Sequence, residues 1–126
     1  VDRIKIVDKL NQYRHSKKPL NICIQVNISE ENTKSGIGLN DVKEFAKIIS
    51  NQKNLKFRGV MAIPSKTNEN QNLVSQYRLL KKLYEDLKIS YSSVDTLSIG
   101  MSNDYLLAIE NGANLVRIGT KIFGAR

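Results

Sequence analysis

The sequence alternates between helix-like and strand-like segments along its whole length. Residues 20–28 are typical of a strand, because polar and apolar side chains alternate there with a period of two. Three more short apolar segments predict strands, and apolar residues recur at helical spacing between them. The predicted strands are 20–28, 55–63, 96–99 and 115–118, and the predicted helices are 3–14 (with Asp2 as N-cap), 39–50, 71–88 and 104–111. Helices that connect successive strands imply parallel pairing, so the sequence predicts an α/β fold.

Such a sheet belongs either to a doubly wound fold or to a TIM-type (β/α)8 barrel. Four strands are too few for a barrel, because small closed barrels contain about eight. If the architecture is a barrel, the 126 residues form its second half. The chain also begins with Val1 rather than Met, close to the first predicted helix. We therefore expect residues 1–126 to be a partial single domain, the last β/α units of a barrel, with the N-terminal half absent.

One face of the first predicted strand is polar. It carries Asn21, Cys23, Gln25 and Asn27, whereas the other face carries only isoleucine and valine. Strands buried in a doubly wound sheet are normally apolar on both faces. The polar face therefore favours a barrel, in which these side chains either meet a ligand or hydrogen-bond one another.

The composition is typical of a soluble globular domain. No segment approaches the roughly 20 apolar residues of a membrane span, and no export leader precedes residue 20. Cys23 is the single cysteine, which argues against a disulfide framework and fits a cytoplasmic location. The net charge of +8 leaves a basic nucleic-acid-binding fragment as an alternative. The lysines are spread along the chain without interleaved aromatic residues, however, so we expect a solvated lysine-rich surface.

The last two predicted strands end in segments rich in glycine and hydroxyl residues. One segment runs from Gly100 to Asp104, the other contains Gly119 and Thr120, and each leads into a helix start. Glycine permits close approach to the backbone, and free N–H groups at a helix start suit an anion. In many TIM barrels the phosphate site lies in the loops after strands seven and eight. The two segments together predict a phosphate site, although Ser102 or Asp104 alone is also typical of an N-cap and Gly119 of a turn.

Five motifs resemble the signatures of the YggS/PROSC family of pyridoxal phosphate (PLP) homeostasis proteins. They are QVNI (25–28), TKSGI (33–37), RGVMAIP (58–64), LSIGMS (97–102) and VRIGTKIFGAR (116–126). They occur in the family's order and at similar spacing over nearly the whole chain, which is far more specific than any single motif. The resemblance implies the C-terminal half of a PLP-binding TIM (β/α)8 barrel that is similar to the N-terminal domain of alanine racemase.

The resemblance also implies roles for five residues. Ser102 and the backbone at Met101 contact the phosphate of PLP, and Gly119 and Thr120 complete that site. Arg117 faces the pyridine nitrogen. Because arginine stays protonated in proteins, it keeps this nitrogen unprotonated and makes the ring a weaker electron sink. No metal is implied.

The implied function is intracellular PLP (vitamin B6) homeostasis by a non-catalytic carrier or buffer in the cytoplasm. Its expected partners are PLP and PLP-dependent apo-enzymes, with no nucleic acid and no membrane, and the full-length protein is expected to be a monomer or a weak dimer. The main alternative is a fold-type III PLP enzyme such as an amino-acid racemase. That class takes a catalytic tyrosine from an additional C-terminal β domain, and no tyrosine of this chain lies in a motif typical of such a base: Tyr13, Tyr77, Tyr84, Tyr91 and Tyr105.

Two features depart from the family pattern. Asn103 and Asp104 follow the serine where the family often has two acidic residues. The family's Schiff-base lysine lies on an early strand that precedes the residues aligned here, and no lysine of this chain occupies that motif. Lys34 lies in a loop after a strand and is a weak candidate to replace it, whereas we expect Lys66 and Lys121 to be solvated.

A half barrel exposes a sheet edge and an uncovered inner face, and both favour association. We therefore expect the isolated 126-residue chain to be poorly folded or oligomeric, while the full-length protein is stable. Light scattering coupled to size-exclusion chromatography, together with a thermal melt, measures this. A monomeric chain with a cooperative melt would contradict the expectation.

Overall fold

The computed structural model of the chain describes residues 1–29, 35–65 and 70–124. One parallel sheet has the order β1-β2-β3-β4, formed by β1 (Leu20–Val26), β2 (Leu55–Ala62), β3 (Thr96–Met101) and β4 (Leu115–Arg117). The helices are α1 (Ile4–Tyr13), η1 (Leu39–Asp41), α2 (Val42–Ser50), α3 (Asn70–Ser90), α4 (Tyr105–Glu110) and α5 (Thr120–Phe123). Every predicted strand and helix is present, and the predicted α/β class is confirmed.

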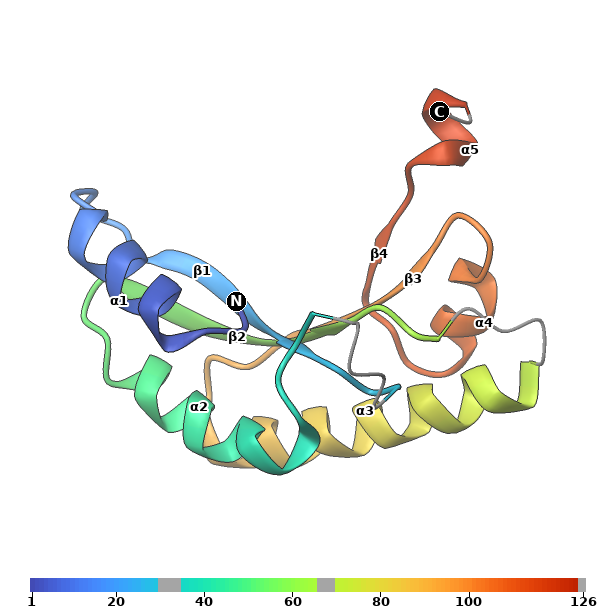
Figure 1. Ribbon diagram of the computed structural model, residues 1–126, viewed down its shortest axis with the longest axis horizontal. Helices are drawn as coiled ribbons and strands as arrows, with labels where there is room; N and C mark the ends of the chain where they lie inside the picture. The colour runs from blue at the N-terminus through green and yellow to red at the C-terminus, as the bar shows by residue number, and fades with distance from the viewer. Residues whose placement is uncertain (30–34, 66–69, 125–126) are drawn as a thin grey trace.

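The strands lie in the sheet in the same order as in the chain. A doubly wound sheet reverses its strand order in the middle, whereas successive strands of a TIM barrel are neighbours. The sheet is therefore consistent with half of a TIM barrel. α2 packs against β1 and β2, α3 against β2 and β3, and α4 against β3 and β4. Figure 1 shows α2 and α3 along one side of the sheet, while α5 projects away from it.

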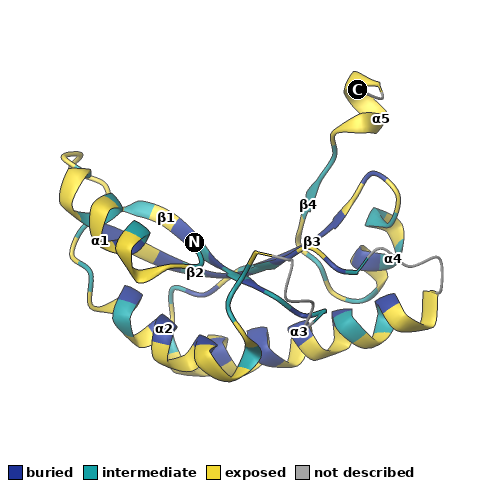
Figure 2. Cartoon of the chain, viewed as in Figure 1, coloured by how far each residue is buried: buried dark blue, intermediate teal, exposed yellow. Residues whose placement is uncertain are grey.

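The hydrophobic core lies between the sheet and these helices. The alternation in β1 is confirmed, because the apolar side chains of this segment are at most 7% exposed: Ile22, Ile24, Val26 and Ile28. The same core contains buried residues of α2 and α3, among them Phe45, Ile49, Tyr77 and Leu80. Full burial of one such side chain stabilises a protein by about 1.5–3 kcal/mol, so this layer is the main source of stability. Figure 2 shows the buried residues on the sides of α2 and α3 that face the sheet.

The outer surface is polar and rich in lysine. Lysines at positions 5, 9, 43, 47, 81 and 82 are all exposed, as expected for solvated side chains. The longest helix, α3, exposes its charged residues and buries apolar residues and two tyrosines toward the core. Within residues 1–29, 35–65 and 70–124, no helix is both long and apolar enough to cross a membrane.

The polar face of β1 lies opposite this core. Its side chains are half-buried or exposed, and their hydrogen bonds lead to the loop that follows the strand. Gln25 donates through Nε2 to the carbonyl of Ser35 at 3.2 Å, and Asn27 accepts a hydrogen bond from the Ser29 hydroxyl at 3.1 Å. Gln25 therefore bonds to the loop and not to its polar neighbours on the strand.

The start of α1 differs from the prediction, because Asp2 is not its N-cap. Arg3 occupies that position and makes no side-chain capping hydrogen bond. Val1 is held on the edge of β1: its amino group donates to the carbonyl of Cys23, and its carbonyl accepts from the N–H of Gln25, both at 2.8 Å. This is the pattern of a parallel strand partner, and it fixes where the chain can turn into the helix.

β3 is longer than predicted, because it continues through Gly100 to Met101. Met101 pairs with Arg117 after a shift in register. Gly100 has φ of +93°, and a Cβ atom there would lie 2.6 Å from the Cβ of Ala108. Only glycine permits this backbone conformation together with the close approach of α4, so the glycine extends the strand instead of ending it.

Helix α3 is joined to the loop between β3 and α4 by a buried hydrogen bond. The Tyr77 hydroxyl donates to Oδ2 of Asp104, and burial together with this carboxylate raises the pKa of Tyr77. We expect Tyr77→Phe to lower the free energy of unfolding by about 1.5–3 kcal/mol, because a hydrogen bond to a charged group is lost. Tyr84→Phe on the same helix is the matched control, since Tyr84 is also a buried residue but its hydroxyl forms no hydrogen bond within the described residues. Urea denaturation measures both variants, and equal losses would contradict the expectation.

The reactivity of the single cysteine, Cys23, measures how well the polar face of β1 is shielded from solvent. Burial raises the pKa of the Cys23 thiol, although the positive amino terminus and Arg58 oppose this effect. The thiolate is the reactive form, so we expect iodoacetamide to modify native Cys23 more slowly at pH 8 than Cys23 of the urea-unfolded chain. The pH at which the modification rate reaches half of its maximum should be higher for the native protein than for the unfolded chain. Superimposable profiles for the two states would show that the thiol is not shielded.

Candidate functional site

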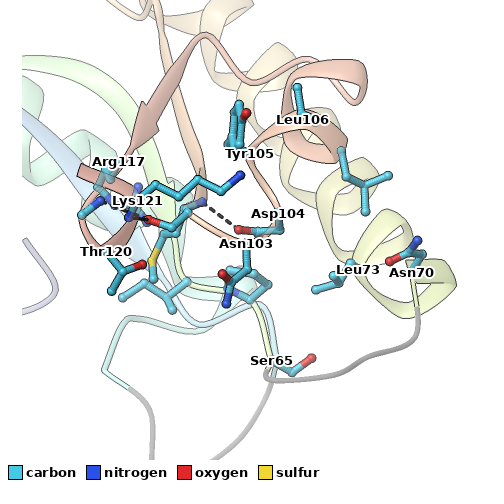
Figure 3. A pocket seen from close by; sticks show the side chains of 16 residues that line it. Ser65, Asn70, Leu73, Asn103, Asp104, Tyr105, Leu106, Arg117, Thr120 and Lys121 are labelled. Atoms are coloured by element: carbon cyan, nitrogen blue, oxygen red, sulfur yellow. Dashed lines mark hydrogen bonds between the residues drawn. The ribbon is translucent and has the colours of Figure 1, made fainter. Parts of the chain in front are cut away.

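The loops that follow β2, β3 and β4 meet at the carboxyl end of the sheet and line a cavity of about 1010 Å³. The five residues predicted to contact PLP all contribute to its lining: Met101, Ser102, Arg117, Gly119 and Thr120. Figure 3 shows Arg117 and Thr120 on one side of this cavity and Leu73 of α3 on the other. The structure therefore brings the predicted residues together, and their roles toward PLP stay predictions.

Ser102 connects the two loops that the sequence singled out. Its side chain is buried, and its Oγ accepts hydrogen bonds from the N–H groups of Gly119 at 3.2 Å and Lys121 at 3.4 Å. The serine therefore does not cap α4, the alternative that the sequence left open. Because a hydroxyl has two acceptor lone pairs and one proton, these contacts leave the proton of Ser102 as a donor.

Gly119, which donates its N–H to Ser102, leaves space for a ligand in the cavity. Its φ is −120°, and a Cβ atom placed on it would meet nothing within 4 Å. Thr120 follows in the chain with an exposed side chain that also lines the cavity. The space beside the Cα of Gly119 is thus open to a ligand, although the Gly119 N–H already donates to Ser102. The hydroxyl side chains of Ser102 and Thr120 line the same cavity.

Arg117 places a positive charge on the inner side of the sheet. Its Nη1 donates to the carbonyl and hydroxyl of Ser98 at 3.1 and 2.6 Å, and its Nη2 donates to the carbonyl of Ala62 at 3.0 Å. Partial burial lowers the pKa of Arg117, while the carboxylate of Asp104 opposes this effect, and the guanidinium remains protonated. Among the described residues no carboxylate forms a salt bridge with Arg117. The charge is held by neutral oxygen atoms and is available to a ligand.

Asp104 shapes the loop between β3 and α4. It occupies the N-cap position of α4 but makes no capping hydrogen bond. Instead its Oδ1 accepts from the N–H of Met101 at 2.8 Å, the dashed line in Figure 3, and its Oδ2 accepts from Tyr77. Asp104 therefore has the N-cap position that the sequence left open as an alternative, but its carboxylate does not cap the helix. In addition, the Met101 N–H, which the resemblance assigns to a phosphate, is already committed to Asp104.

The structure describes only one of the three lysines that the sequence analysis considered, Lys121. Lys34 and Lys66 lie outside the described residues. Lys121 is exposed, as expected, and its ammonium lies 4.5 Å from the centroid of the Tyr105 ring. In the described part of the chain, no group of three or more His, Cys, Asp or Glu residues is placed to hold a metal ion.

Sequence reasoning did not identify Ser98 or Tyr77 as partners of site residues. Ser98 interrupts an apolar strand four positions before Ser102, and such a polar residue in a buried strand is the signal that points to it. Tyr77 carried no comparable signal, because its position on α3 is typical of a core residue.

Comparison with known proteins matches the chain to one family model and to relatives that share one name. The family model of the alanine racemase N-terminal domain matches residues 1–126. The pyridoxal phosphate homeostasis proteins of Pasteurella multocida and Escherichia coli K12 are 47% and 44% identical over the whole chain, which covers 55% and 54% of their lengths. The chain thus spans about half the length of these curated relatives, and the resemblance predicted from its motifs is confirmed.

Two solved structures have the same fold over 98% of the chain. An unknown protein from Bifidobacterium adolescentis superimposes with a TM-score of 0.90 at 26% identity, over 51% of its own chain. PipY of Synechococcus elongatus, solved with PLP bound, superimposes with a TM-score of 0.87 at 23% identity, over 58% of its own chain. With the family model matched from the first residue to the last, this chain belongs to the alanine racemase N-terminal domain family.

Proposed function

We propose that this chain supplies the phosphate-binding side of a PLP-binding homeostasis protein. The observation that carries the proposal is the convergence of Ser102, Gly119 and Arg117 on one cavity at the carboxyl end of a parallel sheet. A hydroxyl donor, the open space beside Gly119 and an unneutralised cation suit an anionic ligand. The names of the relatives and the PLP-bound neighbour support PLP as that ligand.

The residues present fit the cofactor. Gly119 leaves open the space that a side chain would fill, so a phosphate oxygen can approach the backbone there. Ser102 and Thr120 would hold the phosphate by their hydroxyl groups, and Arg117 would donate to the ring nitrogen. When bound, PLP supplies an aldehyde that reacts with amines and an electron-withdrawing ring.

We infer that the protein binds, buffers and delivers PLP in the cytoplasm to apo-enzymes and does not catalyse a reaction. A guanidinium beside the ring nitrogen disfavours its protonation, which weakens the ring as an electron sink. A racemase also needs a strong base, and Tyr77 does not suit this role because its pKa is raised and its hydroxyl is bonded to Asp104. Both points favour a carrier over an enzyme.

We also infer that residues 1–126 are the C-terminal half of a barrel. The length of the relatives and the sequential order of the strands support this. The edge of β1 also supports the half-barrel inference. This edge hydrogen-bonds to Val1 in the pattern of a parallel strand, so a preceding strand could pair there. On this proposal the lysine that bonds covalently to PLP belongs to the other half.

Gly119→Ala tests the phosphate site with little effect on the fold. The added methyl group meets nothing within 4 Å, so we expect the free energy of unfolding to change by less than about 1 kcal/mol. The same methyl group narrows the space for a phosphate, so we expect the full-length protein to lose roughly 10-fold or more in PLP affinity, about 1.4 kcal/mol. Titration followed by absorbance measures the affinity.

Pyridoxal, which lacks the phosphate, is the matched ligand control. Its weaker binding should be the same in the wild type and in Gly119→Ala, because only the phosphate contact changes. If the variant binds PLP as tightly as the wild type does, the phosphate lies elsewhere. If the wild type does not bind PLP at all, the proposed function is wrong.

A further inference from the structure

Two polar side chains are buried among the described residues: Ser98 of β3, and Ser102, which directly follows this strand. Ser102 is 6% exposed, and its hydroxyl accepts the N–H groups of the loop after β4. Ser98 is 3% exposed and lies four residues earlier. A buried hydroxyl must be paired, so its partner indicates its role.

The partner of Ser98 is Arg117. The Oγ to Nη1 distance of 2.6 Å is short, and the Ser98 carbonyl accepts from the same nitrogen at 3.1 Å. One residue thus engages both protons of Nη1. The Ala62 carbonyl on β2 engages Nη2 at 3.0 Å. These three acceptors fix the plane of the guanidinium across β2, β3 and β4.

This arrangement leaves particular donors of Arg117 for a ligand. A guanidinium has five N–H groups in a rigid fork. Within the described residues Nε has no acceptor, and Nη2 has one acceptor for its two protons. Nε and one proton of Nη2 therefore remain for a ligand, and the contacts of Nη1 with Ser98 determine where the free edge that carries Nε points.

We propose that Ser98 is the positioning residue for Arg117 and holds its free edge toward the nitrogen of the bound pyridine ring. This inference rests on the proposed function. Ser98 does so without a negative charge, which keeps the full positive charge of Arg117 beside the ring. A carboxylate in the same place would neutralise that charge. Ser98 thus serves the ring end of the ligand and Ser102 the phosphate end.

The test separates the ring nitrogen from the rest of the ligand. We compare the affinity of the full-length protein for PLP with its affinity for the analogue in which C–H replaces the ring nitrogen. In the wild type we expect the analogue to bind roughly 10-fold more weakly, since a hydrogen bond from a charged donor is lost. In Ser98→Ala we expect this ratio to fall to about 2-fold, because a misplaced guanidinium gains little from the nitrogen.

Two variants serve as controls. Ser102→Ala should weaken both ligands by the same factor and keep the ratio, because it acts at the phosphate. Ser98→Thr keeps the hydroxyl and should restore the wild-type ratio. If Ser98→Ala does not fold, Ser98→Cys gives the same comparison, because its thiol is a weak acceptor.

The outcomes are distinct. A ratio near the wild-type value in Ser98→Ala, with both affinities lowered equally, overturns the positioning role and leaves the proposed function intact. The absence of PLP binding by the wild type overturns the proposed function and this inference with it. A reduced ratio in Ser98→Ala, restored in Ser98→Thr, supports the assignment.

Discussion

Parallel pairing in chain order is the constraint on which the rest of this structure depends. Because all four strands run the same way, their carboxyl ends lie at one edge of the sheet, and the loops after β2, β3 and β4 become neighbours. Residues that are far apart in the sequence, such as Ala62, Ser98 and Arg117, meet there. The helices that make the crossovers bury one face of the sheet, and the proposed ligand site lies at its carboxyl end.

Much of this was accessible from the sequence, because the relevant signals are local. The period of two in β1 and the helical spacing in α2 and α3 predict the elements and the buried face. The glycine and hydroxyl residues after the last two strands predict where an anion would bind. Asp2 is not the cap that the sequence predicted, and Asp104 occupies the N-cap position without a side-chain capping bond. Their carboxylates have other partners, Arg3 in one case and Met101 and Tyr77 in the other, and the Tyr77 contact joins residues 27 positions apart. No local pattern encodes such a contact.

On the proposed function, one strand and the residue after it would serve both ends of the ligand. β3 contributes Ser98, which acts through Arg117, and is followed directly by Ser102, which acts through its own hydroxyl. Gly100 lies between them, where its positive φ and the close packing of Ala108 fix the path of the backbone. The spacing of the two serines along this backbone sets the spacing of the two anchors.

The three hydrogen bonds of Arg117 have a mechanical consequence for the last strand. β4 has only three residues, and its ladder with β3 is interrupted by a shift in register. The guanidinium reaches past β3 to the carbonyl of Ala62 on β2, so it acts as a tether that ties the short edge strand to the middle of the sheet. Loss of this side chain would free the strand as well as remove a charge. If Arg117 binds the ligand as proposed, ligand affinity and the anchoring of the C-terminal segment depend on the same residue, and a substitution there changes both.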